Sequence, residues 1–428
     1  MSRALRERAE ALDAQDPLRQ YHERFAHPQG PEGGAVLYLC GHSLGLMPLA
    51  ARQHVTEEMD DWARLGVEGH HLARRDWIGY TERLSAPLAR LAGANEHEVV
   101  AMNSLTVNLH LLMASFYRPV GRRRCIVIEQ GAFPSDRHAV SSHIHWHRLP
   151  ADSLVELPSP TDAEGGGEPE LEALLRERGE EIALVLWPGV QYRSGRAFDL
   201  GRIAAAAHTA GACCGFDLAH SIGNMPLNLH GDGADFAVWC SYKYLNAGPG
   251  AIGGAFVHER HARAALPGLA GWWGHDPATR FRMGPEFVPA HGAAGWQVSN
   301  PPILSAAPLL ASLAIFGSAG MDALRAKSLQ MSSLLVAELD SRFGDDVELL
   351  TPRAATQRGS QLSLRLRGGR HRGRQVFEAM GKAGAVMDWR EPDVLRLSFV
   401  PLYNRFADVA HFCELLASAL GAQRESTS

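Results

Sequence analysis

Lysine and cysteine are both scarce in this 428-residue chain, and each shortage narrows what the protein can be. The six cysteines are scattered, mostly inside apolar runs, and no two of them form a C-x-x-C pair. This pattern favours small core residues in a reduced, cytoplasmic protein over a disulfide framework. The lysines are Lys243, Lys327 and Lys382, so chemistry that needs a lysine amine has few candidates.

Excess positive charge, a leader segment and a clear membrane span are also missing. The formal net charge is −5, which gives the chain no general attraction to nucleic acid. The opening residues alternate charges with alanine and leucine and lack the apolar core of a signal peptide. The uncharged stretch 298–321 is long enough to cross a bilayer, but its prolines and serines predict a loop leading into a buried helix. We therefore expect no membrane partner.

The composition is that of an ordinary globular protein, with 46% hydrophobic and 21% charged residues. Strand and helix patterns alternate through the middle of the chain, which predicts an α/β fold with a large, doubly wound, mostly parallel sheet. After residue 321 the pattern changes to a smaller α+β region. We expect an N-terminal segment (1–45) packed with the small domain, a large domain (46–305) and the small domain (306–428).

Hydrophobic periodicity gives the individual elements. Helices are predicted at 1–25, 48–66, 83–93, 103–116, 170–178, 200–210, 322–339, 374–383 and 406–420. Strands are predicted at 36–40, 125–129, 143–149, 182–186, 210–216, 236–240, 361–366 and 394–399.

The stretch 214–254 carries the most informative chemistry. Asp217 and His220 follow one predicted strand, and Tyr242 and Lys243 follow the next. Ligands gather outside the carboxyl ends of parallel strands, so these four side chains should converge on one site. Pyridoxal phosphate needs a lysine for its Schiff base and an acid beside its pyridine nitrogen. The pattern therefore predicts a site for this cofactor.

Each of these residues also has an ordinary interpretation. A lone lysine is usually solvated, and a lone aspartate after a strand usually caps a turn or a helix. The combination at this spacing favours the cofactor. The helix predicted at 103–116 adds free backbone N–H groups suited to a phosphate.

The segment 216–250 resembles the cofactor-lysine segment of kynureninase, a fold type I pyridoxal phosphate enzyme related to class V aminotransferases. Other strings resemble the family in the same order along nearly the whole chain: YLCGHSLGL (38–46), NSLTVNLHLLMASFYRP (103–119), FPSD (133–136), GWWGH (271–275), SNPP (299–302) and VPLYN (400–404).

The resemblance implies a hydrolase of tryptophan catabolism that cleaves the Cβ–Cγ bond of kynurenine or 3-hydroxykynurenine, giving alanine and an anthranilate. It implies catalytic roles for Lys243, Asp217 and Tyr242, and no metal. The implied cofactor contacts are Leu105, Thr106, Phe133, Pro134, Ser135, Asp136, Pro188, Asp217, His220, Tyr242, Lys243, Trp272 and Asn300. The implied substrate contacts are Ser43, His70, Ser299, Asn300 and Arg396. The family also implies a homodimer in which Trp272 and Asn300 come from the neighbouring subunit.

Taken singly, several of these residues allow plainer interpretations. FPSD can be a turn with a helix cap, and Arg396 can be an exposed arginine on an edge strand. His70 can cap a helix, and Asn300 can merely start a turn. The chain also departs from the family pattern at His42, where asparagine is usual, and at Pro188, where many members carry a hydroxyl. These departures leave the contacts of Ser43 and of position 188 open.

Two further patterns have plainer explanations, and two rival functions would use the same scaffold. HIHWH (143–147) would place three imidazoles on one face of a strand, but no acidic or cysteine ligand accompanies them, which favours a half-exposed strand over a metal site. The basic run 365–374 lacks interleaved aromatic residues, so a solvated loop is favoured over nucleic-acid binding. A cysteine desulfurase or aminotransferase, or a non-catalytic cofactor-binding relative, would share the scaffold.

Overall fold

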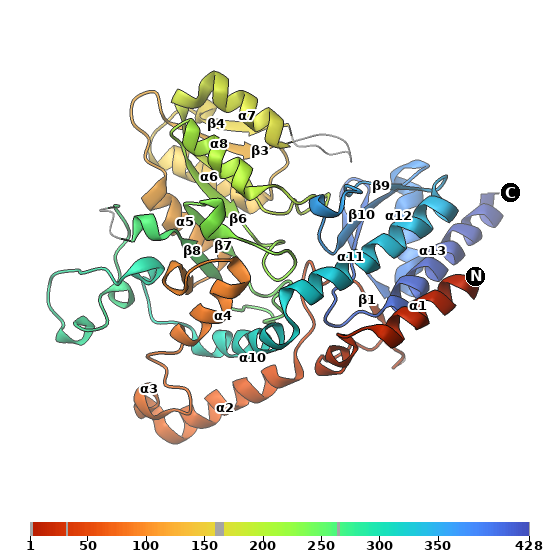
Figure 1. The fold of residues 1–428 in the computed structure, drawn as a ribbon, viewed down its shortest axis with the longest axis horizontal. Coiled ribbons are helices and arrows are strands. Elements are labelled where there is room, and N and C mark those ends of the chain that lie inside the picture. The colour runs from red at the N-terminus through yellow and green to blue at the C-terminus, as the bar shows by residue number, and fades with distance from the viewer. Residues whose placement is uncertain (1–2, 31–32, 159–166, 263–265, 428) are drawn as a thin grey trace.

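The structure is a computed structural model that describes residues 3–30, 33–158, 167–262 and 266–427. Figure 1 shows a large lobe built on one sheet and a smaller lobe that contains both chain ends, with the helices α10 (Ile303–Ala319) and α11 (Met321–Glu338) running between them.

The large sheet has seven strands in the order β2-β8-β7-β6-β5-β3-β4. Their bounds are β2 Val99–Ala101, β3 Cys125–Glu129, β4 Leu154–Leu157, β5 Ile182–Pro188, β6 Cys213–Asp217, β7 Phe236–Trp239 and β8 Gly254–Val257. The strands from β4 to β7 are parallel, β8 runs antiparallel to β7, and β2 pairs antiparallel with β8. The predicted mostly parallel α/β fold is therefore confirmed.

Helices cover both faces of this sheet, which explains why its strands are apolar runs rather than alternating patterns. Their bounds are α2 Leu49–Leu65, α3 Gly69–Leu72, α4 Glu82–Ala92, α5 Leu105–Phe116, α6 Pro134–Trp146, α7 Gly167–Arg178, α8 Leu200–Thr209 and α9 Leu229–Asp232. One apolar cluster packs the sheet against α5 and α6, and another packs it against α4, α7, α8 and α10. The sheet is thus sandwiched, and its strand ends remain available for a site.

The small lobe is an antiparallel four-stranded sheet, in the order β12-β13-β10-β9, covered by helices. Its elements are β9 Val347–Leu349, β10 Gln361–Leu366, α12 Gly369–Lys382, β11 Ala385–Val386, β12 Asp388–Arg390, β13 Val394–Ser398 and α13 Phe406–Thr427. The N-terminal helix α1 (Arg3–Gln15) contributes Leu5 and Ala9 to this lobe's core, and β1 (Leu37–Tyr38) pairs with β11. The expected domain boundaries stay predictions.

The predicted strand at 143–149 is wrong, because residues 143–146 belong to α6. This helix begins with Pro134, whose fixed φ suits a first helical turn, and so it carries the HIHWH run in helical form. His143 is buried whereas His145 and His147 are exposed, so the three imidazoles do not share one face. The loop predicted at 365–374 is also too long, because α12 already begins at Gly369.

Within the described ranges, no single helix is long and apolar enough to cross a membrane, although α10 and Met321–Phe343 pass that test as a pair bent by 81°. The uncharged stretch 298–321 forms a loop followed by α10, whose apolar side chains are mostly buried, as expected.

Candidate active site

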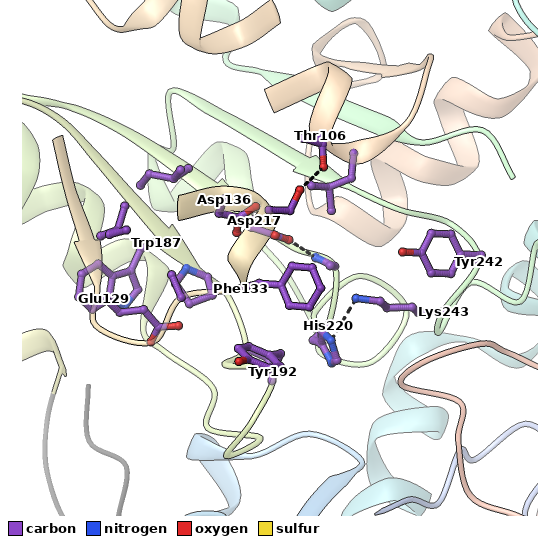
Figure 2. Close-up of a pocket in the computed structure, with 18 residues that line it drawn as sticks. Thr106, Glu129, Phe133, Asp136, Trp187, Tyr192, Asp217, His220, Tyr242 and Lys243 are labelled. Atoms are coloured by element: carbon purple, nitrogen blue, oxygen red, sulfur yellow. Dashed lines mark hydrogen bonds between the residues drawn. The ribbon is translucent and has the colours of Figure 1, made fainter. Parts of the chain in front are cut away.

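The carboxyl ends of β3, β5, β6 and β7 surround a cavity of about 250 Å³ (Figure 2). The expected residues that line it are Leu105, Thr106, Phe133, Ser135, Asp136, Pro188, Asp217, His220, Tyr242 and Lys243. Chain segments more than a hundred residues apart therefore meet where the alternating strand and helix pattern predicted.

Lys243 lies in this cavity with its amine against a histidine. Its Nζ is 3.1 Å from Nε2 of His220, and Figure 2 shows the two side chains pointing toward each other. Burial lowers the pKa of His220 well below its usual value, and the nearby Lys243 lowers it further. The neutral imidazole can therefore accept a hydrogen bond from the amine and hold it in place.

Two carboxyl groups lie side by side on the opposite wall. Asp217 ends β6 and its Oδ1 accepts a hydrogen bond from the backbone N–H of Ala219 at 2.7 Å. Burial raises the pKa of Asp136 well above its usual value, and the neighbouring Asp217 raises it further. Two buried carboxylates this close cannot both ionise easily, so the pair retains a proton while one member can face a cation.

An anion-binding corner lies between two helix starts. Thr106 is in the first turn of α5 and Ser135 is in the first turn of α6, and their hydroxyl oxygens are 2.7 Å apart. Helix N-termini carry free N–H groups and a partial positive charge, which suits a phosphate.

Lys243 lies in the connection between β7 and β8. Beyond the lysine this connection needs left-handed backbone, with φ of +83° at Gly248 and +72° at Gly250. The amide of Gly45 donates to the carbonyl of Tyr242 at 2.8 Å, so the segment GHSLGL packs directly on the lysine turn. A lysine, a carboxyl pair and a phosphate corner in one cavity together fit pyridoxal phosphate.

Comparison with known proteins agrees with this geometry. Residues 324–416 match a family model described as the kynureninase C-terminal domain. The kynureninase of Xanthomonas euvesicatoria pv. vesicatoria is 54% identical over 413 residues, covering 96% of this chain and 97% of that protein. The kynureninase of Stenotrophomonas maltophilia is 55% identical over 412 residues, again covering 96% and 97%. The chain belongs to the kynureninase family.

Solved structures with the same fold come from other enzymes. The cystine C-S lyase C-DES, in a complex with cysteine persulfide, has a TM-score of 0.75 at 18% identity, covering 91% of this chain and 99% of its own. The cysteine desulfurase CsdA from Escherichia coli has a TM-score of 0.72 at 18% identity, covering 95% and 98%. At this identity the likeness shows the fold alone, which is the predicted fold type I architecture.

Arg396, expected to bind substrate in a kynureninase, lies on β13 outside the cavity lining. Its side chain is 1% exposed, so the alternative of an exposed edge arginine is wrong. One guanidinium nitrogen donates to Asp388 at 2.5 Å and the other donates to the carbonyl of Tyr192 at 2.5 Å. Because Tyr192 lines the cavity, Arg396 lies directly behind its wall.

The remaining expected residues do not line the Lys243 cavity. His70, Trp272 and Asn300 line a second pocket of about 260 Å³. Ser299 is exposed beside it, and Ser43 lies in the turn after β1. Pro134 begins α6 next to the cavity without lining it. The structure thus gathers most of the implied cofactor contacts in one place and most of the implied substrate contacts in another.

Several lining residues were not predicted from the sequence. They include Ile128, Glu129, Ala132, Leu186, Trp187, Val190, Tyr192 and Ala219. Most of them lie at the ends of strands or just beyond. For Glu129, its position as the last residue of β3 is the sequence signal that could have identified it as a lining residue. Tyr192 lies in a loop after β5, and its ring meets that of Phe133 edge to face at 5.2 Å between centroids. No sequence pattern marks such a contact.

Proposed function

We propose that this protein hydrolyses the Cβ–Cγ bond of kynurenine or 3-hydroxykynurenine to L-alanine and the corresponding anthranilate, with pyridoxal phosphate bound through Lys243. The observation that carries the proposal is the 3.1 Å contact of the Lys243 amine with neutral His220 inside a cavity that also holds a carboxyl pair. Membership of the kynureninase family supports the same reaction.

When bound, pyridoxal phosphate supplies an electron sink for the electrons released as substrate bonds break. The chain's residues would then have separate tasks. Lys243 holds the cofactor and afterwards moves the proton at the substrate's Cα. Asp217, with Asp136 beside it, keeps a proton at the pyridine nitrogen, because a carboxylate favours the charged pyridinium.

Binding and orientation fall to other side chains. Thr106 and Ser135 would hold the phosphate at the two helix N-termini, and Tyr242 adds a hydroxyl whose pKa is raised by burial, so it stays a donor. Phe133 would cover the cofactor ring, since Lys243 Nζ lies 5.8 Å from the centroid of its ring. Arg396 would bind the substrate carboxylate through its planar fork of donors.

The test is mass spectrometry of the products after incubation with each substrate. Release of L-alanine with anthranilate or 3-hydroxyanthranilate, lost in the Lys243→Ala variant, is the expected result. An enzyme that instead releases sulfur from cysteine, transfers the amino group, or turns over neither substrate would contradict the proposal.

We also infer that the working enzyme is a homodimer with shared sites. His70, Trp272 and Asn300 line a pocket that has no residue in common with the Lys243 cavity, and a second copy could bring these residues to that cavity. Mixing the inactive variants Lys243→Ala and Asn300→Ala should restore part of the activity, because mixed dimers contain one site with both native residues. Failure to recover activity in a demonstrated mixed dimer would contradict the shared site.

A reducing compartment such as the cytoplasm is the location we infer. Each of the six cysteines, all of them in the described ranges, is free of a disulfide, and four of them are buried. Thiol titration of the denatured protein, purified without reductant, should find every cysteine reduced.

A further inference from the structure

Arg396 is positioned by Asp388, a residue for which the sequence analysis predicts no role. Asp388 on β12 lies directly opposite Arg396 in the antiparallel register, and the two side chains form an ion pair at 2.5 Å. The second guanidinium nitrogen is held by the carbonyl of Tyr192. With 1% of the side chain exposed, these two acceptors determine where the guanidinium points.

His42 is the second unexplained group in this region. Its side chain is fully buried, and within the part of the chain that the structure describes neither ring nitrogen has a hydrogen-bond partner. Its Nε2 lies 3.8 Å from Oδ2 of Asp388, and its ring centroid lies 6.5 Å from that of His220. His42 therefore sits between the Arg396 pair and the histidine that contacts Lys243.

A buried donor without an acceptor is unfavourable, so such a group in a folded protein calls for a ligand or a water molecule. Burial lowers the pKa of His42 well below its usual value, with Arg396 and Lys243 adding to the effect. The ring is therefore neutral and offers one N–H. It can donate to an anion without adding a further buried charge.

The local charges also point to an anionic ligand. Asp388 pairs with Arg390 at 3.0 Å as well as with Arg396, so two guanidinium groups share a single carboxylate. This leaves one positive charge next to a buried histidine. Arg390 is 38% exposed and can be solvated, whereas Arg396 is buried and its Nε has no hydrogen-bond partner among the described residues. A ligand carboxylate would supply the acceptor that this buried guanidinium lacks.

We propose that His42 and Asp388 complete the subsite for the substrate's α-carboxylate, with His42 donating a hydrogen bond to it and Asp388 positioning Arg396. This inference rests on the proposed function. Asp388 acts only through Arg396, whereas His42 touches the substrate.

The test uses two ligands that differ by the carboxylate. L-alanine, the expected product, and ethylamine, which is the same amine without the carboxylate, are titrated into the cofactor-loaded protein by calorimetry. We expect His42→Leu and Asp388→Ala each to weaken L-alanine binding about tenfold and to leave ethylamine binding unchanged. Asp388→Asn keeps an acceptor oxygen and should recover most of the loss. In kynurenine turnover, KM should rise more than kcat falls.

Glu391→Gln is the matched control, because Glu391 lies in the same hairpin but pairs at the surface with Arg370. It should change the binding of neither ligand. The inference is overturned if His42→Leu and Asp388→Ala leave L-alanine binding unchanged or weaken both ligands equally.

A different result would contradict the proposed function itself. If the unmodified protein forms no alanine from kynurenine, the reaction is wrong, whatever the variants do. Should Asp388→Ala fail to fold in a thermal melt, His42→Leu and Asp388→Asn still decide the outcome, because an unchanged L-alanine affinity in His42→Leu would refute the subsite.

Discussion

Replacing Arg396 by lysine separates the charge of this side chain from its geometry. The guanidinium donates to two acceptors in different directions, Asp388 and the carbonyl of Tyr192, each at 2.5 Å. A lysine ammonium keeps the positive charge, so Asp388 is not left unpaired. It cannot reproduce the planar fork that holds a carboxylate through two parallel hydrogen bonds.

The expected loss follows from the number of hydrogen bonds at stake. A hydrogen bond to a charged group contributes about 1.5 to 3 kcal/mol, and at least one such bond to the substrate carboxylate disappears. We therefore expect kcat/KM for kynurenine to fall by roughly tenfold to a thousandfold, equivalent to about 1.4 to 4 kcal/mol. Cofactor binding should persist, because Arg396 lies outside the cavity lining.

The measurement is kcat/KM from steady-state kinetics with kynurenine. The visible absorbance of the bound cofactor is recorded alongside it. Arg365→Lys is the control, because Arg365 lies on the neighbouring strand β10 and pairs with Glu348 and Asp393 rather than with Asp388. An unchanged kcat/KM in Arg396→Lys would refute the carboxylate role. Loss of the cofactor from this variant would show that the arginine supports the fold of the site instead.

Three other predictions address the cofactor, the substrate ring and the stability of the fold. Lys243→Ala should lose the visible cofactor absorbance and the activity, and borohydride reduction with peptide mapping should label Lys243; a label on either other lysine would contradict the assignment. If His70 and Asn300 form hydrogen bonds with the substrate's ring hydroxyl, kcat/KM should be higher for 3-hydroxykynurenine than for kynurenine. The double change His70→Trp with Asn300→Thr should narrow or reverse this difference. Equal values of kcat/KM in the unmodified enzyme would exclude the role. Although burial alone would raise it, hydrogen bonds from two histidines, an arginine and a backbone amide hold the pKa of Asp235 below its usual value. The contribution of Asp235 to the free energy of unfolding should therefore be complete above about pH 4, the pKa of an unfolded aspartate, and should decline as the pH falls below it. Near neutral pH, Asp235→Asn should lower the free energy of unfolding by about 3 kcal/mol in denaturant unfolding. An unchanged midpoint would disprove the contribution.

The sequence predicted the parts of the fold that depend on local patterns. Strands such as β3 and β10 were predicted at their observed bounds, because a short apolar run between turn residues is a strong signal. The helical form of residues 143–146 was not predicted. The apolar and polar residues from 143 to 147 alternate, which is typical of a strand. The helix-start signal is Pro134, which lies nine residues before this segment.

The site was predictable where its residues end consecutive strands. Asp217 ends β6 and Lys243 follows β7, and parallel topology brings them to the same edge of the sheet. The placement of Arg396 was not predictable in this way, since its burial depends on Asp388 across the sheet and on a loop about two hundred residues earlier. Alternation along β13 indicates that Arg396 faces away from Leu395 and Leu397, but it does not say what covers that face.

Pro188 shows how the scaffold accommodates a departure from the family pattern without losing the cavity. It is the last residue of β5, opposite Asp217 in the parallel register, where a missing N–H does little harm. The next amide, that of Gly189, donates to the carbonyl of Asp217 at 2.8 Å, so the contact between the two strand ends is kept. Position 188 then contributes an apolar part of the cavity wall, and Thr106 and Ser135 at the helix starts contribute hydroxyl groups. Because helix N-termini attract a phosphate through several backbone donors at once, we expect phosphate binding here to depend less on any single strand-end hydroxyl than on the packing of α5 against α6.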